Sequence, residues 1–185
     1  MVLSAFGATA QANSNVVTVE SINTQAIVTM EALSSMALIN WKVGDATDYN
    51  VSLGGFGMNG TMRKEATKEE GEAIWIKSEL KLPIMQDTQE MLMDRNTGKV
   101  LKYLHNGKEE NMPDEKVEIV KTAYESVTVP AGTYKCTHVW AKSEQVQDIQ
   151  IWMNNRDIAL DGAAKMYMDQ GQIKITMELT KSNKQ

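Results

Sequence analysis

The chain holds one cysteine, Cys136, and two histidines, His105 and His138. Cys136 and His138 are two positions apart, so a β-strand would place both side chains on one face. A thiolate and an imidazole suit a copper or zinc ion, and the same pair could act as a nucleophile with its base. Neither Cys-x-x-Cys nor His-x-x-x-His is present. A buried free cysteine more often packs as a small apolar side chain, and we favour that interpretation.

Other motifs that mark enzymes are missing from the sequence. It contains no Gly-x-Ser-x-Gly, Walker A, Gly-x-Gly-x-x-Gly or His-Glu-x-x-His motif. The charged run 64–71, KEATKEEG, is expected to form a hairpin loop on the surface. We therefore expect no catalytic residues, no metal site, no cofactor and no enzymatic activity. A hydrolase or metal enzyme is the less favoured alternative, and it requires His105, Cys136 and His138 to meet in one pocket.

Length and charge narrow the class of protein. With 185 residues, the chain is the size of one ordinary domain. Nineteen Lys and Arg against 24 Asp and Glu give a formal charge of −5, which argues against a nucleic-acid partner. A single cysteine excludes an internal disulfide, and no apolar run is long enough for a transmembrane helix.

The first residues indicate export. Residues 1–12 are apolar or small and end in Ala10-Gln11-Ala12, the small-x-small pattern of a signal peptidase site. No Lys or Arg precedes the apolar stretch, so an ordinary apolar N-terminus, such as a first strand, is the alternative. We expect cleavage near Ala12, a single β-rich domain over 13–185, and a periplasmic or secreted location in a bacterium.

The body of the chain alternates apolar and polar residues, as antiparallel strands do. Tight-turn sequences such as Asn59-Gly60 and Asn106-Gly107 separate the alternating segments. Together they predict a mainly β fold, an antiparallel curled sheet or open barrel of about ten strands. The alternating segments are 72–82, 134–140, 149–153 and, most clearly, 173–179, with 100–104 and 127–129 as shorter candidates.

One segment follows a different period. In Thr24–Leu38, the apolar residues Ile27, Met30 and Leu33 recur at nearly helical spacing, and Thr24 could cap the first turn. This predicts one short N-terminal helix. The β-branched Ile27 and its neighbour Val28 favour a strand instead, so both interpretations stay open.

Three stretches resemble a family of exported bacterial proteins of unknown function, the DUF3108 domains. They are Trp41-Lys42-Val43-Gly44-Asp45 with Tyr49, the turn Val127-Thr128-Val129-Pro130-Ala131-Gly132-Thr133-Tyr134, and Ile151-Trp152 through Asp157-Ile158 to Leu179. The turn is the most specific, although Pro130 and Gly132 also suit a generic hairpin. The resemblance covers roughly residues 41–180. It implies secretion and a curved sheet similar to the half-barrels of lipoprotein carriers.

Thirteen methionines stand out in the composition. Methionine adapts to varied apolar shapes, so it suits the lining of a binding cleft, although it also fills gaps in ordinary cores. We expect a domain of the cell envelope that binds an apolar ligand, such as a lipid or acyl chain, or a lipidated partner. The alternative is an envelope protein-interaction or scaffolding module without a small ligand. The expected lining is Ile27, Met30, Leu33, Ile74, Ile76, Ile173, Ile175 and Met177.

Overall fold

The computed structural model describes residues 39–55, 57–112, 116–144, 146–171 and 173–185. These residues form eleven antiparallel strands in one sheet and contain no helix, hence none that could cross a membrane. The predicted helix over 24–38 and the predicted cleavage site lie outside the described residues. The strands are β1 (Ala46–Gly54), β2 (Met58–Glu70), β3 (Ala73–Leu82), β4 (Met85–Asp94), β5 (Val100–His105), β6 (Lys108–Glu110), β7 (Glu118–Val129), β8 (Gly132–Lys142), β9 (Asp148–Met153), β10 (Ala163–Asp169) and β11 (Lys174–Asn183).

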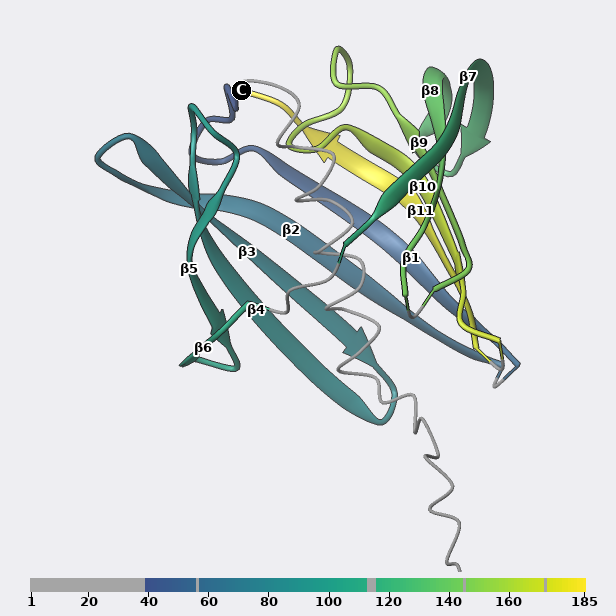
Figure 1. Cartoon of the computed structure of the whole chain (residues 1–185), viewed down its shortest axis with the longest axis horizontal. Helices are drawn as coiled ribbons and strands as arrows, with labels where there is room; N and C mark the ends of the chain where they lie inside the picture. The colour runs from purple at the N-terminus through teal and green to yellow at the C-terminus, as the bar shows by residue number, and fades with distance from the viewer. Residues whose placement is uncertain (1–38, 56, 113–115, 145, 172) are drawn as a thin grey trace, which may run out of the picture.

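The sheet consists of two meanders joined in its middle. Its strand order is β6-β5-β4-β3-β2-β1-β11-β10-β9-β8-β7, so every pair except β1 with β11 joins strands that are neighbours in sequence, and β6 and β7 form the two ends. At β1 and β11 the first and last of the described strands pair, with Val51 opposite Met177 and Leu53 opposite Ile175. Figure 1 shows β1 beside β11, with the first meander (β1–β6) and the second meander (β7–β11) curling away on either side.

The curl brings non-neighbouring strands together without closing a barrel. The strand order ends at β6 on one side and at β7 on the other. The tip of the β7–β8 hairpin folds back onto β11, where the amide of Ala131 donates a hydrogen bond to the carbonyl of Leu179, 3.0 Å away. β7 also approaches β10 and β11, which are not its partners in the sheet. The predicted mainly β, curled and unclosed sheet is therefore confirmed.

One face of the sheet is apolar, as the alternation predicts. Along β11, Ile175, Met177 and Leu179 are buried while the residues between them are half-buried or exposed. The buried side chains form two main clusters. Cluster 1 draws mostly on the second meander, β1 and the ends of β2 and β3. Cluster 2 lies in the first meander and includes Ile74, Ile76 and Met91.

The β9–β10 loop (residues 154–162) connects the two clusters. Its Ile158 belongs to cluster 1, whereas Ala159 and Leu160 belong to cluster 2. The loop folds on itself through the amide of Asn154, which donates to the carbonyl of Gly162 at 2.8 Å. Gly162 has a φ of +73°, and a Cβ there would lie 2.7 Å from the amide nitrogen of Asn155. Only glycine fits that position, because both the backbone angle and the space exclude a side chain.

The charged run 64–71 was expected to be a surface loop, and that prediction was wrong. β2 continues through it to Glu70, and the turn follows at Gly71. Lys64 and Ala66 alternate with exposed or half-buried neighbours and point their side chains into the buried face. The composition of 64–71 indicated a solvent-exposed loop, because five of the eight residues are charged. Every second residue of this part of β2 is buried, namely Met62, Lys64 and Ala66, which is the period of a strand with one face in the core.

Candidate functional site

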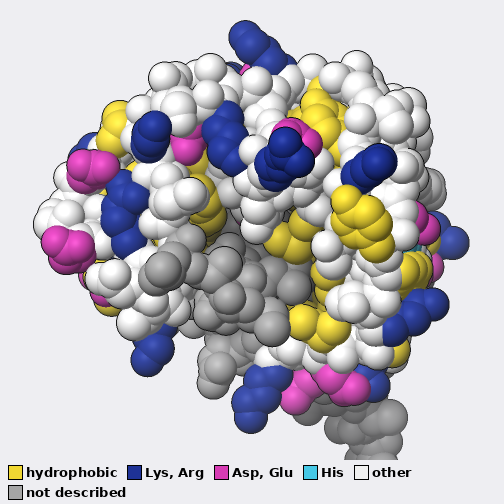
Figure 2. Space-filling view, turned by 90° about the horizontal axis from the view of Figure 1, so that it is seen from above, with side chains coloured by type: hydrophobic (Ala, Val, Ile, Leu, Met, Phe, Trp, Pro, Cys, Tyr) yellow, Lys and Arg dark blue, Asp and Glu magenta, His cyan; other side chains and the backbone are white. Residues whose placement is uncertain are grey.

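The inner face of the curl carries the methionines. Ten of the thirteen lie among the described residues, and each belongs to a cluster or packs against one. Met62, Met166, Met168 and Met177 are buried in cluster 1, with Met58, Met85 and Met153 against it; Met91 and Met93 are buried in cluster 2, with Met112 against it. Figure 2 shows hydrophobic side chains near the middle of the molecule, among polar ones, in the view from above. The soft side chains are therefore concentrated on one face rather than scattered.

The predicted lining residues divide between the two clusters. Ile173, Ile175 and Met177 are buried in cluster 1, and Ile74 and Ile76 in cluster 2. Two rows expected to line one cleft therefore belong to neighbouring regions of the same face. The remaining three predicted lining residues, Ile27, Met30 and Leu33, lie outside the described part of the chain.

A row of polar side chains crosses the first meander between the apolar regions. Successive strands place Lys64 opposite Ser78, Ser78 opposite Gln89, and Gln89 opposite His105. On one side of this row Met62 and Leu80 belong to cluster 1. On the other, Ile76 and Met91 belong to cluster 2. We call Lys64, Ser78, Gln89 and His105 the polar row.

The first member of the polar row forms a buried ion pair with the β9–β10 loop. The ammonium of Lys64 lies 2.9 Å from Oδ2 of Asp161, and both side chains are less than a tenth exposed. Oδ1 of Asp161 accepts a hydrogen bond from the amide of Ala163 at 3.1 Å. The hydroxyl of Tyr49 donates to the carbonyl of Ala163, and burial, aided by the charge of Asp161, raises the tyrosine pKa well above its ordinary value. The pair fastens the loop to the first meander.

The far end of the row contains a buried carboxylate. Oδ1 of Asp87 lies 2.6 Å from Nε2 of His105, and Oδ2 accepts a hydrogen bond from the side-chain nitrogen Nε2 of Gln89 at 3.0 Å. Two polar atoms in the middle of the row, Ser78 Oγ and Gln89 Oε1, have no hydrogen-bond partner among the described residues. Both residues are almost fully buried. An unpaired buried polar atom costs about 1–3 kcal/mol, so these atoms favour a partner that can hydrogen-bond to them.

The second histidine lies in a separate aromatic cluster. The ring of His138 is stacked on that of Trp152 and tilted against that of Trp140, with ring centroids 3.9 and 3.4 Å away. Oε1 of Glu125 lies 2.7 Å from Nδ1 of His138 and accepts a hydrogen bond from the Trp152 indole at 2.6 Å. Both hydrogen bonds lower the pKa of the Glu125 carboxyl, and the bond from the Trp152 indole has the larger effect. The ammonium of Lys121 lies 4.0 Å from the Trp140 ring centroid.

The chemical candidates from the sequence do not come together. His105 is on β5 and His138 on β8, with seven strands between them in the sheet order. Cys136 is buried in cluster 1, and burial raises the pKa of its thiol to about 11, so it stays protonated at neutral pH. In the part of the chain that the structure describes, no three His, Cys, Asp or Glu side chains are grouped so as to hold a metal ion.

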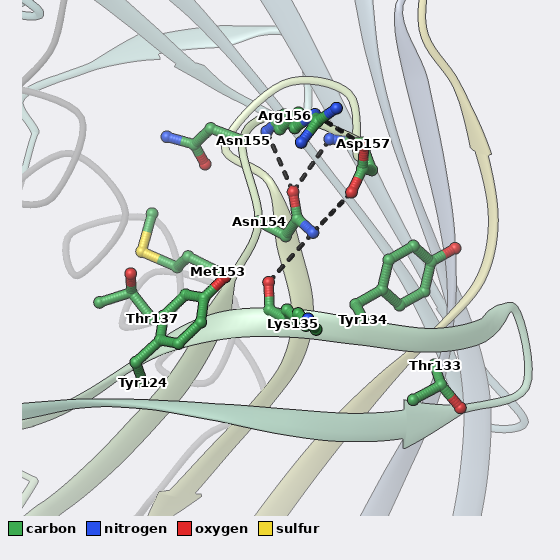
Figure 3. Close-up of a pocket in the computed structure, with 10 residues that line it drawn as sticks. All are labelled: Tyr124, Thr133, Tyr134, Lys135, Thr137, Met153, Asn154, Asn155, Arg156 and Asp157. Carbon is green, nitrogen blue, oxygen red and sulfur yellow. Dashed lines mark hydrogen bonds and ion pairs between the residues drawn. The ribbon is translucent and has the colours of Figure 1, made fainter.

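A polar hollow of about 410 Å³ opens where the β7–β8 hairpin meets the β9–β10 loop. Figure 3 shows Tyr124, Thr137 and Met153 together on one side of it, with Tyr134 on the other. Asn154 shapes its rim by donating to the carbonyl of Lys135 and to Asp157, while its Oδ1 accepts from the amides of residues 156 and 157. These hydrogen bonds position the loop, and the lining differs from the apolar one that the sequence predicts.

The comparisons with known proteins show limited similarity. No protein-family model matches the chain, and no curated protein matches it. Among solved structures, a presumed exported protein with a YmcC-like fold from Bacteroides fragilis matches over 80% of this chain and 99% of its own, at 12% identity and a TM-score of 0.48. MucB matches over 89% of this chain and 59% of its own, at 8% identity and a TM-score of 0.42.

A presumed lipoprotein from Parabacteroides distasonis matches over 79% of this chain and 98% of its own, at 13% identity and a TM-score of 0.40. Similarity at this level does not identify a family. The resemblance to DUF3108 domains therefore stays a prediction.

Proposed function

We propose that this chain is an exported, non-enzymatic β-domain whose inner face binds an apolar ligand, such as a lipid or acyl chain. The observation that carries the proposal is the gathering of all ten described methionines in or against the two clusters of an unclosed sheet. Flexible, polarisable side chains can repack around apolar shapes that differ in length and branching. A sheet that leaves its two edges apart can also widen more easily than a closed barrel.

The polar row supports a ligand that carries a hydrogen-bonding group. Lys64 and His105 each lie within ion-pair distance of a carboxylate, that of Asp161 and that of Asp87 respectively. The unpaired atoms, Ser78 Oγ and Gln89 Oε1, can together donate and accept. A neutral hydroxyl, ester or amide attached to an alkyl chain suits this arrangement better than a carboxylate.

Export is part of the proposal and has its own test. The Ala10-Gln11-Ala12 pattern and the resemblance to DUF3108 domains support cleavage and an envelope location. N-terminal sequencing of the exported protein is expected to begin at Asn13. Recovery of an intact chain from the cytosol, beginning at Met1, would contradict export.

Ligand binding is tested on the protein from its own envelope. Native mass spectrometry is expected to show a co-purified lipid, and a fluorescent fatty-acid probe is expected to bind saturably. Met177→Gln, in cluster 1, should weaken probe binding, whereas Ile84→Gln, on the exposed surface, should not. No saturable binding to any apolar probe or lipid extract would refute the proposal.

The second candidate function is a protein-interaction module of the envelope. Strand β7 supports it, because three of the six large hydrophobic side chains exposed in the described residues belong to this strand. Exposed apolar side chains grouped on one element are typical of interaction surfaces.

A further inference from the structure

β7 is a long edge strand that the rest of the described chain leaves open. It ends the strand order, pairs only with β8, and extends over 12 residues. Residues 118–126 are all exposed, whichever way their side chains point. Ile119, Val120 and Tyr124 are 40, 57 and 74% exposed. Such a strand presents unpaired amide and carbonyl groups along one side, which can pair with another strand.

The usual protections of an edge strand are weak here. Proteins shield edges by shortness, by proline, by inward charges or by bulges. β7 contains no proline, and its irregularity falls between Ile119 and Lys121, near its start. From Lys121 to Val129 its register with β8 is continuous. A regular, exposed stretch therefore remains for pairing.

The charges of this stretch are complementary to themselves. Antiparallel pairing of two copies about Ala123 places Lys121 of each copy opposite Glu125 of the other, twice by symmetry. Lys121 forms no ion pair with a carboxylate among the described residues. Glu125 uses Oε1 for both His138 and Trp152, so Oε2 can accept from a partner lysine.

We propose that the protein forms a symmetric dimer by antiparallel pairing of β7 with β7 of a second copy, centred on Ala123. The two sheets then continue as one through the dimer axis. Tyr124 of each copy lies opposite Thr122 of the other on the second face of the joined strands. This inference does not depend on ligand binding, because the edge and the inner face are separate surfaces.

Cross-linking tests the register. Cysteine replaces Ala123 or, as the matched control, Ser126, both exposed on β7, in a Cys136→Ala background. Ala123→Cys places the two thiols opposite each other, within disulfide reach, and is expected to give a covalent dimer on oxidation. Ser126→Cys faces Val120 and should stay monomeric on the same gel. Equal cross-linking of both variants, or of neither, would overturn the proposed register.

Charge reversal tests the contact in solution. Sedimentation equilibrium should show a dimer for the unmodified protein, and Lys121→Glu should raise its dissociation constant about tenfold or more, since two opposite-charge pairs become like-charge pairs. Lys121→Glu combined with Glu125→Lys should restore the dimer. Lys108→Glu, on β6 at the other edge, should leave it unchanged. A monomer at all concentrations, or a reversal that the second substitution does not restore, would overturn the proposal and favour pairing with a different protein.

Discussion

The two meanders end at edges built in opposite ways. The first meander ends in β6, a strand of three charged residues, Lys108–Glu110, after the turn Asn106-Gly107 with φ values of 50° and 79°. The second ends in β7, a strand of 12 residues whose hairpin turn is anchored on β11. A short charged strand presents few backbone groups to a partner strand, whereas a long regular one presents a continuous row of amide and carbonyl groups. The sheet therefore presents one protected edge and one open edge.

Their interiors differ in a related way. The first meander buries charges, with Lys64 and Asp87 each paired under the curl. The strands of the second meander bury an almost purely apolar row, including Ile149, Ile151, Met166 and Met168, and the buried charge of this meander, Asp161, lies in the β9–β10 loop. Specificity in the first meander thus comes from polar pairing, and stability in the second comes from apolar area.

Breaking the ion pair that joins the meanders should have the largest effect. Asp161→Ala leaves Lys64 buried without a partner, and loss of one member of a buried pair costs about 3–5 kcal/mol. The free energy of unfolding, measured with urea, should fall by that amount. Lys64→Met combined with Asp161→Leu should recover most of it. A loss below about 1 kcal/mol for Asp161→Ala would show that water reaches Lys64.

An intermediate effect is expected at the hairpin turns of the two edges. Gly132 has a φ of +143°, so Gly132→Val should lower the free energy of unfolding by about 1–3 kcal/mol through backbone strain. Gly107→Val is the matched control, because Gly107 also has a positive φ but lies before the short β6. Local fraying of β6 can relieve the strain that Gly107→Val introduces, so this variant should leave the global free energy of unfolding almost unchanged. Equal losses in both variants would remove this difference between the edges.

The smallest effect concerns pH at β7. The hydrogen bond from Trp152 and that from His138 hold the Glu125 pKa below its ordinary value near 4.5. A depressed carboxyl pKa contributes stability above that value and loses it as the pH falls through the folded pKa. The melting temperature and the Trp152 indole signal in NMR spectra should therefore change below about pH 4.5. Glu125→Gln should remove this part of the acid dependence, and an unaltered acid transition would contradict the assignment.

The sequence predicted the strands whose two faces differ. Alternation located Ile175 and Met177 on the buried face of β11, and Ile74 and Ile76 on that of β3, and Ile173 is buried directly before β11. It did not reveal β7 before Val127, because residues 118–126 are exposed on both faces and so have no reason to alternate. A strand that is exposed to solvent on both faces has the same hydropathy pattern as a loop.

Contacts between distant residues could not be predicted from the sequence. Lys64 lies in a charged run, and its partner Asp161 is 97 residues away. Periodicity says which face a residue occupies, but nothing about which side chain approaches it from another part of the chain. The cluster of Glu125, His138 and Trp152 was missed for the same reason, although the alternation of His138 with Trp140 indicated part of it.

The pairing of β1 with β11 also determines when the chain can finish folding. Every other strand pair forms between neighbours in sequence, and such hairpins assemble within microseconds. β1 must wait for residues 174–183, and closing so long a loop is slow because entropy is lost before contacts form. A chain that is made from its amino terminus therefore keeps β1 unpaired on one side until residues 174–183 have been added. Until then, apolar Val51 and Leu53 are open to proteases and to aggregation.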